Sequence, residues 1–165
     1  MRCQPVLAAM LLAAALVASP ASAGVTVAFA DPRYFTDADD SSGNSVRTLL
    51  EIKKHLEGLG ARYLQPADLL RIQVLNVDLA GRRQILRSMP SDVRVVTGDA
   101  DWPRIELRYT LESKGKISRP VHETIADMAY LRRIDREYSS VSLPYEKRML
   151  DEWFKARFVE HRPPR

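Results

Sequence analysis

The stretch that most constrains the fold is RIELRYTLE, residues 104–112, in which apolar and polar side chains alternate strictly. Such alternation is typical of a β-strand with one buried and one solvent-facing side, which antiparallel sheets supply. The chain then turns at SKGK, residues 113–116, so a hairpin is expected with its second arm over 117–126. Pro120 lies in that arm and places it at a sheet edge or at a bulge, because proline has no N–H to donate.

Two helices are expected on the basis of apolar residues at helical spacing. The first is predicted over 45–58, with Asn44 or Ser45 as its cap and with Gly58 and Gly60 suited to ending it. Its apolar stripe is predicted to contain Val46, Leu49, Leu50, Ile52, Leu56 and Leu59. The second helix is predicted over 144–158, with proline at its first turn. Its buried stripe is predicted to contain Tyr145, Met149, Leu150, Trp153, Phe154 and Phe158.

A strand at 68–79 has faces that change character along its length. One face begins apolar and becomes polar at Asn76 and Asp78, while the other face does the reverse. A strand of this kind leaves the core at one end, or it twists or bulges there. With further strands at 24–29 and 92–96, the predicted fold class is α+β. The expected architecture is an antiparallel sheet of about four to five strands, with two helices packed on one face.

The N-terminal 23 residues have the pattern of a secretory signal peptide. Arg2 supplies the positive start, residues 6–18 form a short apolar core, and Ala21-Ser22-Ala23 is a cleavage site for signal peptidase. We therefore expect cleavage near Ala23 and a periplasmic or secreted location. No later run approaches the ~18 apolar residues that a transmembrane helix requires, so no transmembrane segment is expected.

Cleavage would also remove Cys3, the single cysteine, and leave a mature chain without disulfides in an oxidising compartment. The remaining chain has the length of one domain, predicted over 24–160, followed by a frayed tail at 161–165. Loss of Arg2 lowers the formal net charge of +4 by one. Positive and negative residues are interleaved, which is typical of a solvated surface. We therefore expect no nucleic-acid partner.

The sequence contains no clear motif for a metal or a cofactor. Residues 37–44, DADDSSGN, begin like a calcium loop with Asp37, Asp39 and Ser41. An EF-hand loop counted from Asp37 needs glycine at its sixth position and glutamate at its twelfth, where this chain has its glycine one position late and Thr48 instead of glutamate. The three histidines are widely separated. We therefore expect neither a metal nor a cofactor.

Three carboxylates are candidate binding or acid–base groups. Asp78 and Asp127 each end a predicted strand, and Asp101 precedes a Trp-Pro pair. Arg94 and Arg104 are candidate binding residues that could also pair with these acids. Asp78 therefore either meets a guanidinium and the turn at the following glycine, or faces an open cavity.

The ordered segments VDLAG, DVRVV, DWPRIELRYTL, ADMAYLR and YEKRMLDEWF together resemble the bacterial domain-of-unknown-function family numbered 3016. The resemblance covers about residues 24–158 and implies a small exported protein with a signal peptide. It implies no activity and no catalytic residue. This chain departs from the family pattern at Arg82, where an acidic residue is frequent, and at Pro120-Val121, where glycine is frequent.

These features favour a small non-enzymatic periplasmic protein that binds a partner protein or a small ligand in the cell envelope. The alternative is a small secreted hydrolase that uses carboxylates, and a weaker third hypothesis is a membrane-surface factor using basic residues. The binding hypothesis predicts an exposed apolar patch or an unpaired sheet edge near 117–126. The hydrolase hypothesis predicts two or more acids converging in one pocket. The oligomeric state is left open.

Overall fold

The computed structural model describes residues 24–40, 43–84, 93–96, 100–132, 138 and 140–164. The predicted signal peptide, residues 1–23, lies outside the described residues. The main sheet has five strands, which are β1 (Gly24–Phe29), β2 (Leu69–Asp78), β5 (Arg104–Ser113), β6 (Lys116–Ile117) and β7 (Val121–Ala126). A separate ribbon pairs β3 (Arg82–Gln84) with β4 (Val93–Val95).

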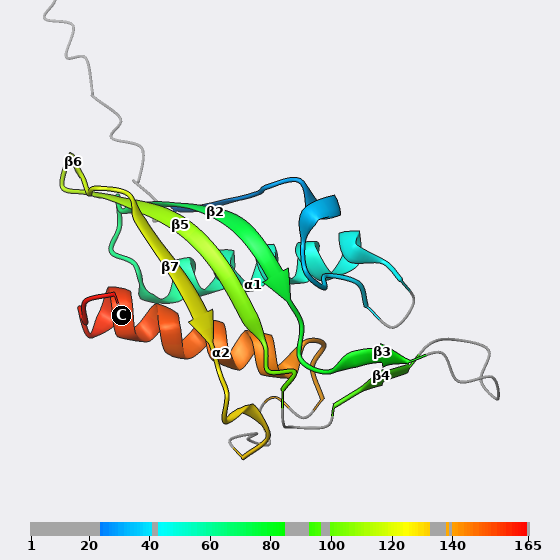
Figure 1. The fold of residues 1–165 in the computed structure, drawn as a ribbon. Helices are drawn as coiled ribbons and strands as arrows, with labels where there is room; N and C mark the ends of the chain where they lie inside the picture. The colour runs from blue at the N-terminus through cyan, green and yellow to red at the C-terminus, as the bar shows by residue number, and fades with distance from the viewer. Residues whose placement is uncertain are drawn as a thin grey trace, which may run out of the picture.

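The strands of the main sheet follow the order β1-β2-β5, and β6 and β7 both pair with β5 (Figure 1). All pairings are antiparallel except that of β1 with β2, which is parallel. The expectation of an antiparallel sheet is thus corrected to a mixed one. The reason is the connection: parallel neighbours need a crossover, and the helix between β1 and β2 provides it.

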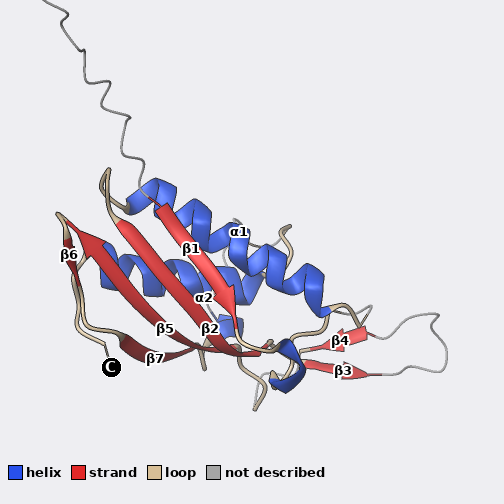
Figure 2. Ribbon diagram, turned by 90° about the horizontal axis from the view of Figure 1, so that it is seen from above, coloured by secondary structure: helices blue, strands red, loops and turns tan. Residues whose placement is uncertain are grey.

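The helices are α1 (Ser45–Tyr63) and α2 (Pro144–Phe154), and the latter continues as a π-helical turn, η3 (Lys155–Val159). Two short 3-10 turns are η1 (Pro32–Tyr34) and η2 (Tyr130–Arg132). Both long helices lie on the same face of the sheet (Figure 2). The predicted α+β class, with two helices on one face, is therefore confirmed.

Helix α1 runs through the two glycines that were expected to end it. An ideal Cβ at Gly60 would lie 2.0 Å from the Cγ2 atom of Val25, whereas one at Gly58 would meet nothing within 4 Å. Gly60 is therefore needed for close packing of α1 on β1. The stripe that α1 buries is also narrower than expected, because Val46 and Leu50 are 73% and 47% exposed.

The change of face along β2 is a β-bulge. The register with β5 shifts between Val74 and Asn76, which leaves Leu75 without a partner in the ladder. The shift turns Val77 into the core, where it is fully buried with Val74. The predicted bulge is confirmed. The alternative, that the strand leaves the core near Asn76, is wrong because Val77 and Leu79, which follow it, are buried in the core.

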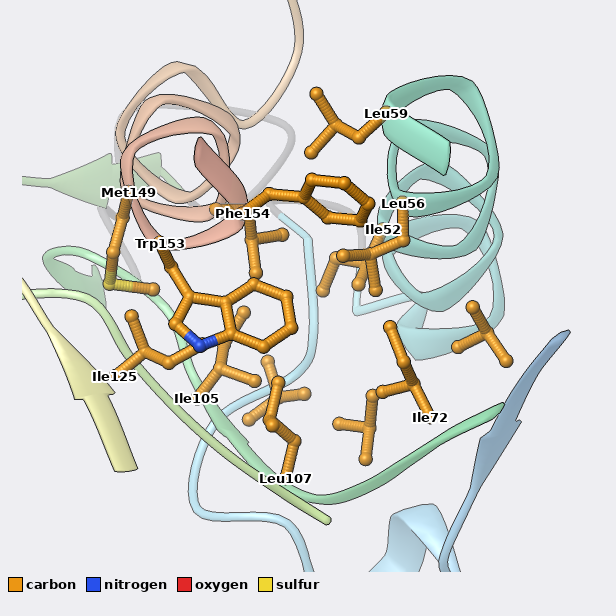
Figure 3. Packing of buried hydrophobic residues seen from close by; sticks show 14 of the residues in the cluster. Ile52, Leu56, Leu59, Ile72, Ile105, Leu107, Ile125, Met149, Trp153 and Phe154 are labelled. Carbon is orange, nitrogen blue, oxygen red and sulfur yellow. The ribbon is translucent and has the colours of Figure 1, made fainter. Parts of the chain in front are cut away.

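The core lies between the sheet and the two helices (Figure 3). Ile52, Leu56 and Leu59 descend from α1, and Met149, Trp153 and Phe154 come from α2. The sheet contributes the apolar side chains that alternate toward the helices along its strands, including Ile72, Ile105, Leu107 and Ile125. The opposite face of the sheet is polar and carries cross-strand pairs such as Arg71 with Glu112 at 3.0 Å. The solvent-facing side predicted from the alternation at 104–112 is therefore present.

Candidate functional site

Asp78 is paired with an arginine on the neighbouring strand. It stands opposite Arg104 in the β2–β5 register, and its Oδ2 atom accepts a hydrogen bond of 2.9 Å from the Nη2 atom of that residue. Both side chains lie on the polar face of the sheet and are partly exposed. This cross-strand pair answers the question that the sequence left open, and it gives both residues a structural partner.

Asp127 is buried directly after β7. Its Oδ2 atom forms an ion pair with the guanidinium of Arg148, which is itself buried on α2. Its Oδ1 atom accepts a hydrogen bond of 3.0 Å from the backbone N–H of Ala129 and so caps the turn that follows the strand. Asp127 therefore joins the sheet edge to α2.

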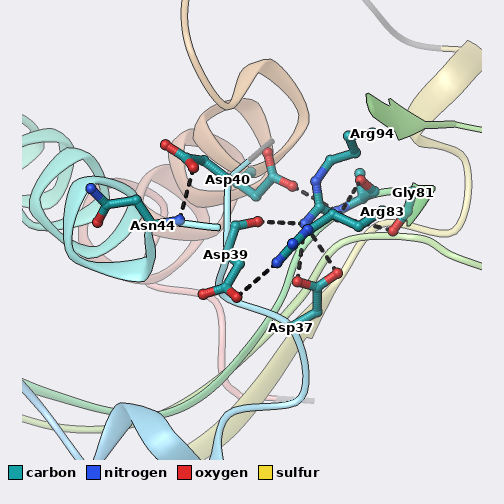
Figure 4. Close-up of polar contacts among 9 residues, drawn as sticks. Asp37, Asp39, Asp40, Asn44, Gly81, Arg83 and Arg94 are labelled. Atoms are coloured by element: carbon teal, nitrogen blue, oxygen red, sulfur yellow. Dashed lines mark hydrogen bonds and ion pairs between the residues drawn. The ribbon is translucent and has the colours of Figure 1, made fainter. Parts of the chain in front are cut away.

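Arg94, on β4, is the centre of a polar cluster at the end of β2 (Figure 4). Its Nη2 atom donates at 3.0 Å to both carboxylate oxygens of Asp37 and at 2.6 Å to the carbonyl of Asp39. Its Nη1 atom donates to the carbonyls of Ala80 and Gly81. The guanidinium therefore fastens the β3–β4 ribbon to the loop before α1 and to the end of β2.

The two acids that suggested a calcium loop are part of this cluster. Asp37 accepts from Arg94, and Asp39 accepts a bond of 3.0 Å from Arg83, as Figure 4 shows. Ser41 lies outside the described residues. Within the described part of the chain, no three His, Cys, Asp or Glu side chains form a group that could hold a metal ion.

Asp101 meets the same cluster through its backbone. Its carbonyl accepts a hydrogen bond of 2.9 Å from the N–H of Gly81. Gly81 has a φ of +77°, and a Cβ there would lie 2.5 Å from the carbonyl oxygen of Val95. The structure thus brings Asp101 and Arg94 to one glycine, while Asp78 with Arg104 and Asp127 occupy other places in the fold.

Glu146 is a buried acid that sequence reasoning did not single out. It lies in the first turn of α2, and its Oε1 atom accepts a hydrogen bond of 2.8 Å from the N–H of Ala80. Burial raises the pKa of Glu146, and the nearby charge of Arg94 opposes that rise. In the sequence an acid at this position is typical of an exposed first helical turn, so no local signal indicates its burial.

His55 and Asp151 join the two helices. The Nε2 atom of His55 lies 2.8 Å from Oδ1 of Asp151, whose other oxygen accepts a hydrogen bond from the hydroxyl of Tyr138. Burial alone would raise the pKa of Asp151, but the hydrogen bonds from His55 and Tyr138 outweigh it and lower that pKa. His55 lies inside α1, two turns before its end, and faces α2.

Glu123 is a second buried carboxylate on β7. It accepts a hydrogen bond of 3.1 Å from Nε1 of Trp153 and forms a bidentate ion pair with the guanidinium of Arg157. The hydroxyl of Tyr109 lies 3.5 Å away, and burial, helped by the charge of Glu123, raises the pKa of Tyr109 to about 12. The alternation of β7 predicts that Glu123 points inward, but only the position of α2 supplies its partners.

A groove of about 450 Å³ runs between β7 and α2. Its walls are residues 123–127 of the sheet edge, residues of α2 and η3, and the C-terminal tail. They include Ile125, Met149, Trp153, Glu152 and Arg162. A smaller cavity of about 280 Å³ lies beside Arg94. Of the predicted site residues, Asp127 lines the groove and Arg94 lines the smaller cavity.

These features define an α+β domain with a mixed sheet, two helices on one face and a groove between an edge strand and a helix. The chain belongs to the family described as "Protein of unknown function (DUF3016)", whose model matches residues 23–156. Comparison with curated proteins and with solved structures gave no match. None of the described helices is long and apolar enough to cross a membrane.

Proposed function

We propose that this protein is a non-enzymatic binding protein of the cell envelope, which takes an extended segment of a partner protein against β7. The observation that carries the proposal is the edge itself. Within the described part of the chain, β7 pairs with a strand on one side only, and the groove beside it is walled by α2. An edge strand presents backbone N–H and C=O groups to which another chain can add.

The groove supplies what a bare edge lacks, which is a place for side chains. In a strand added to β7, every second side chain would point toward the helix layer and into the groove, whose lining includes the edges of the core residues Ile125, Met149 and Trp153. The other edge strand, β1, packs closely against α1 through Val25 and Gly60. The combination of an edge and a groove therefore supports β7 as the binding strand.

The surroundings of the carboxylates support binding over hydrolysis. A carboxylate-dependent hydrolase needs two acids that face a substrate across one pocket. Asp78 is paired with Arg104 on the polar face of the sheet. Three acids line the groove, and each is ion-paired: Asp127 and Glu152 with Arg148, and Glu123 with Arg157.

The proposal includes export. An N-terminal signal sequence would deliver a cysteine-free chain to the periplasm or the medium, where an envelope partner would be met. N-terminal sequencing of the protein recovered from a periplasmic fraction is expected to begin at Gly24. A protein that retains residues 1–23 in the cytoplasm would overturn this part of the proposal.

A site-specific photo-crosslinker tests the binding surface. Placed at Thr124 on β7 in cells, it is expected to give a discrete adduct, and the same group at Lys54 on α1 serves as the control. The adduct segment, identified by mass spectrometry and synthesised, should bind the purified protein saturably in calorimetry. Equal adducts from both positions, or a synthetic segment without saturable binding, would reject β7 as the binding strand.

A further inference from the structure

We propose that the cavity beside Arg94 is a binding site for a small monocarboxylate, a ligand that carries one carboxylate group on a short apolar body. The cavity is separate from the groove beside β7, so this site does not depend on the proposed function. The proposal is supported by the position of the cavity in the fold, by two buried polar atoms in its lining residues, and by the charges around it.

The cavity lies at the end of the fold where a βαβ unit binds ligands. β1 and β2 are parallel and α1 connects them, so these three elements form such a unit. Both strands finish at the edge of the sheet where α1 begins, and α2 also begins there (Figure 1). The start of a helix carries partial positive charge, and no side chain caps α2 at Leu143. Anionic groups bind at this position in α/β folds, because strand ends and helix N-termini meet there.

Two residues that line the cavity have a buried polar atom without a partner. Thr48 is 2% exposed, and its hydroxyl makes no hydrogen bond to any described residue. The same holds for the Nε atom of Arg94, although both Nη atoms of this guanidinium form hydrogen bonds. A buried polar atom without a partner is costly, and native proteins contain few of them. A carboxylate bound in the cavity has two acceptor oxygens, enough for the hydroxyl and for Nε.

The two acids that line the cavity are stabilised by contacts within the protein. The Oδ1 atom of Asp40 accepts a hydrogen bond of 3.0 Å from the backbone N–H of Asn44, which caps α1. The Oε2 atom of Glu51 accepts hydrogen bonds from Nζ of Lys147 at 2.8 Å and from the hydroxyl of Ser142 at 3.0 Å. Neither carboxylate therefore requires a cation from a ligand.

Arg47 is a cation beside the cavity whose charge is not compensated. It lies in the first turn of α1 and is exposed, and its guanidinium makes no hydrogen bond or ion pair with the residues that the structure describes. Arg94, in contrast, is paired with Asp37 at 3.0 Å. A singly charged carboxylate matches the single charge of Arg47, whereas a phosphate dianion would bring excess negative charge close to Glu51.

The size and the apolar part of the cavity restrict the body of the ligand. The cavity has a volume of about 280 Å³, which is the liquid volume of roughly nine water molecules. Leu79, at the end of β2, and Leu143, before α2, both contribute to its lining. A short branched acid such as isocaproate meets both conditions, because its carboxylate can reach the polar atoms while its isobutyl group contacts the leucines.

NMR titration of the isotope-labelled full-length protein tests the site. Isocaproate is expected to shift the amide signals of Thr48, Leu79 and Leu143 saturably, with a dissociation constant of about 1 mM. Its neutral analogue isocaproamide, and inorganic phosphate, should each bind at least about tenfold more weakly. Equal binding of acid and amide, tighter binding of phosphate, or no saturable shift would overturn the proposal. Shifts confined to β7 would also overturn it, and would leave the proposed function standing.

Two substitutions separate ligand binding from folding. Thr48→Val should weaken isocaproate binding about fivefold and raise the melting temperature of the free protein, because it removes a buried hydroxyl without a partner. Arg47→Gln should weaken binding about tenfold. Arg108→Gln, on the polar face of β5, is the matched control and should leave the affinity unchanged. A lower melting temperature for Thr48→Val, or unchanged affinity in both cavity variants, would contradict the proposed site.

Discussion

Asp127 at the end of β7 and Arg148 on α2 form an ion pair that is buried on both sides, with their side chains 7% and 5% exposed. The pair joins the edge strand to the helix that forms the other wall of the groove. Its burial means that neither charge can be left alone without a large desolvation cost. The geometry of the proposed binding surface therefore depends on this pair.

Removal of one partner of this pair should destabilise the fold strongly. Arg148→Met is expected to lower the free energy of unfolding by about 3 to 5 kcal/mol, because it leaves the carboxylate of Asp127 buried without its cation. Urea unfolding followed by circular dichroism measures the loss. The double substitution Asp127→Leu with Arg148→Met should recover most of it, and a double variant as unstable as the single one would contradict this account.

The two glycines of α1 should respond to alanine in opposite directions. Gly60→Ala places a Cβ against Val25 and should cost about 1 to 3 kcal/mol of stability, as overpacking does. Gly58→Ala has open space and should stabilise the helix by about 0.8 to 1 kcal/mol. Thermal unfolding of the two variants side by side decides the matter. Equal effects would show that α1 does not approach β1 as described.

The buried carboxyl of Glu146 should make stability depend on pH. Its pKa is raised in the folded state above the ordinary value of 4.5, so the folded protein holds its proton more tightly than the unfolded chain does. The stability from this group is complete below pH 4.5 and is lost as the pH rises through the folded pKa. Glu146→Gln should remove that loss while keeping an acceptor for Ala80. Chemical unfolding from pH 4 to pH 8 measures the difference, and parallel profiles for the two proteins would contradict the prediction.

The contribution of Asp151 to stability should depend on pH in the opposite direction to that of Glu146, and at lower pH. Its pKa is lowered in the folded state below 3.8, so its stabilising effect is present above that value and is lost as the pH falls through the folded pKa. Asp151→Asn should therefore flatten the acid limb of the stability profile below about pH 4. The variant is compared with the wild type by urea unfolding between pH 2 and pH 5. An unchanged acid limb would show that the bonds from His55 and Tyr138 do not favour the ionised form.

Substitution by lysine should lower the free energy of unfolding much more at Arg94 than at the neighbouring Arg83. Arg94→Lys loses the planar fork that reaches Asp37 and three backbone carbonyls, and we expect a loss of about 2 to 3 kcal/mol. Arg83→Lys changes a partly exposed pair with Asp39 and should cost less than about 1 kcal/mol. Chemical unfolding of both variants provides the comparison. Similar small losses would mean that Arg94 does not hold the ribbon in place.

Local patterns in the sequence determined the parts of the fold that depend on near neighbours. The alternation at 104–112 predicted a strand with one polar face, and the missing N–H of Pro120 predicted an edge strand or a bulge. The structure confirms the polar face and the edge position, since β7 pairs only with β5 among the described strands. These features can be predicted from the sequence because side-chain alternation and missing hydrogen-bond donors are properties of a few consecutive residues.

Tertiary structure decided what depends on segments far apart in the chain. The parallel pairing of β1 with β2, the passage of α1 through Gly60 and the burial of Glu146 each require a neighbour that the local sequence does not contain. The same holds for Asp78 and Asp127, whose acidic character the sequence shows but whose arginine partners only the assembled sheet and helix provide. A carboxylate is a residue type, whereas a buried ion pair or a groove is a relation between surfaces that meet only when the chain has folded.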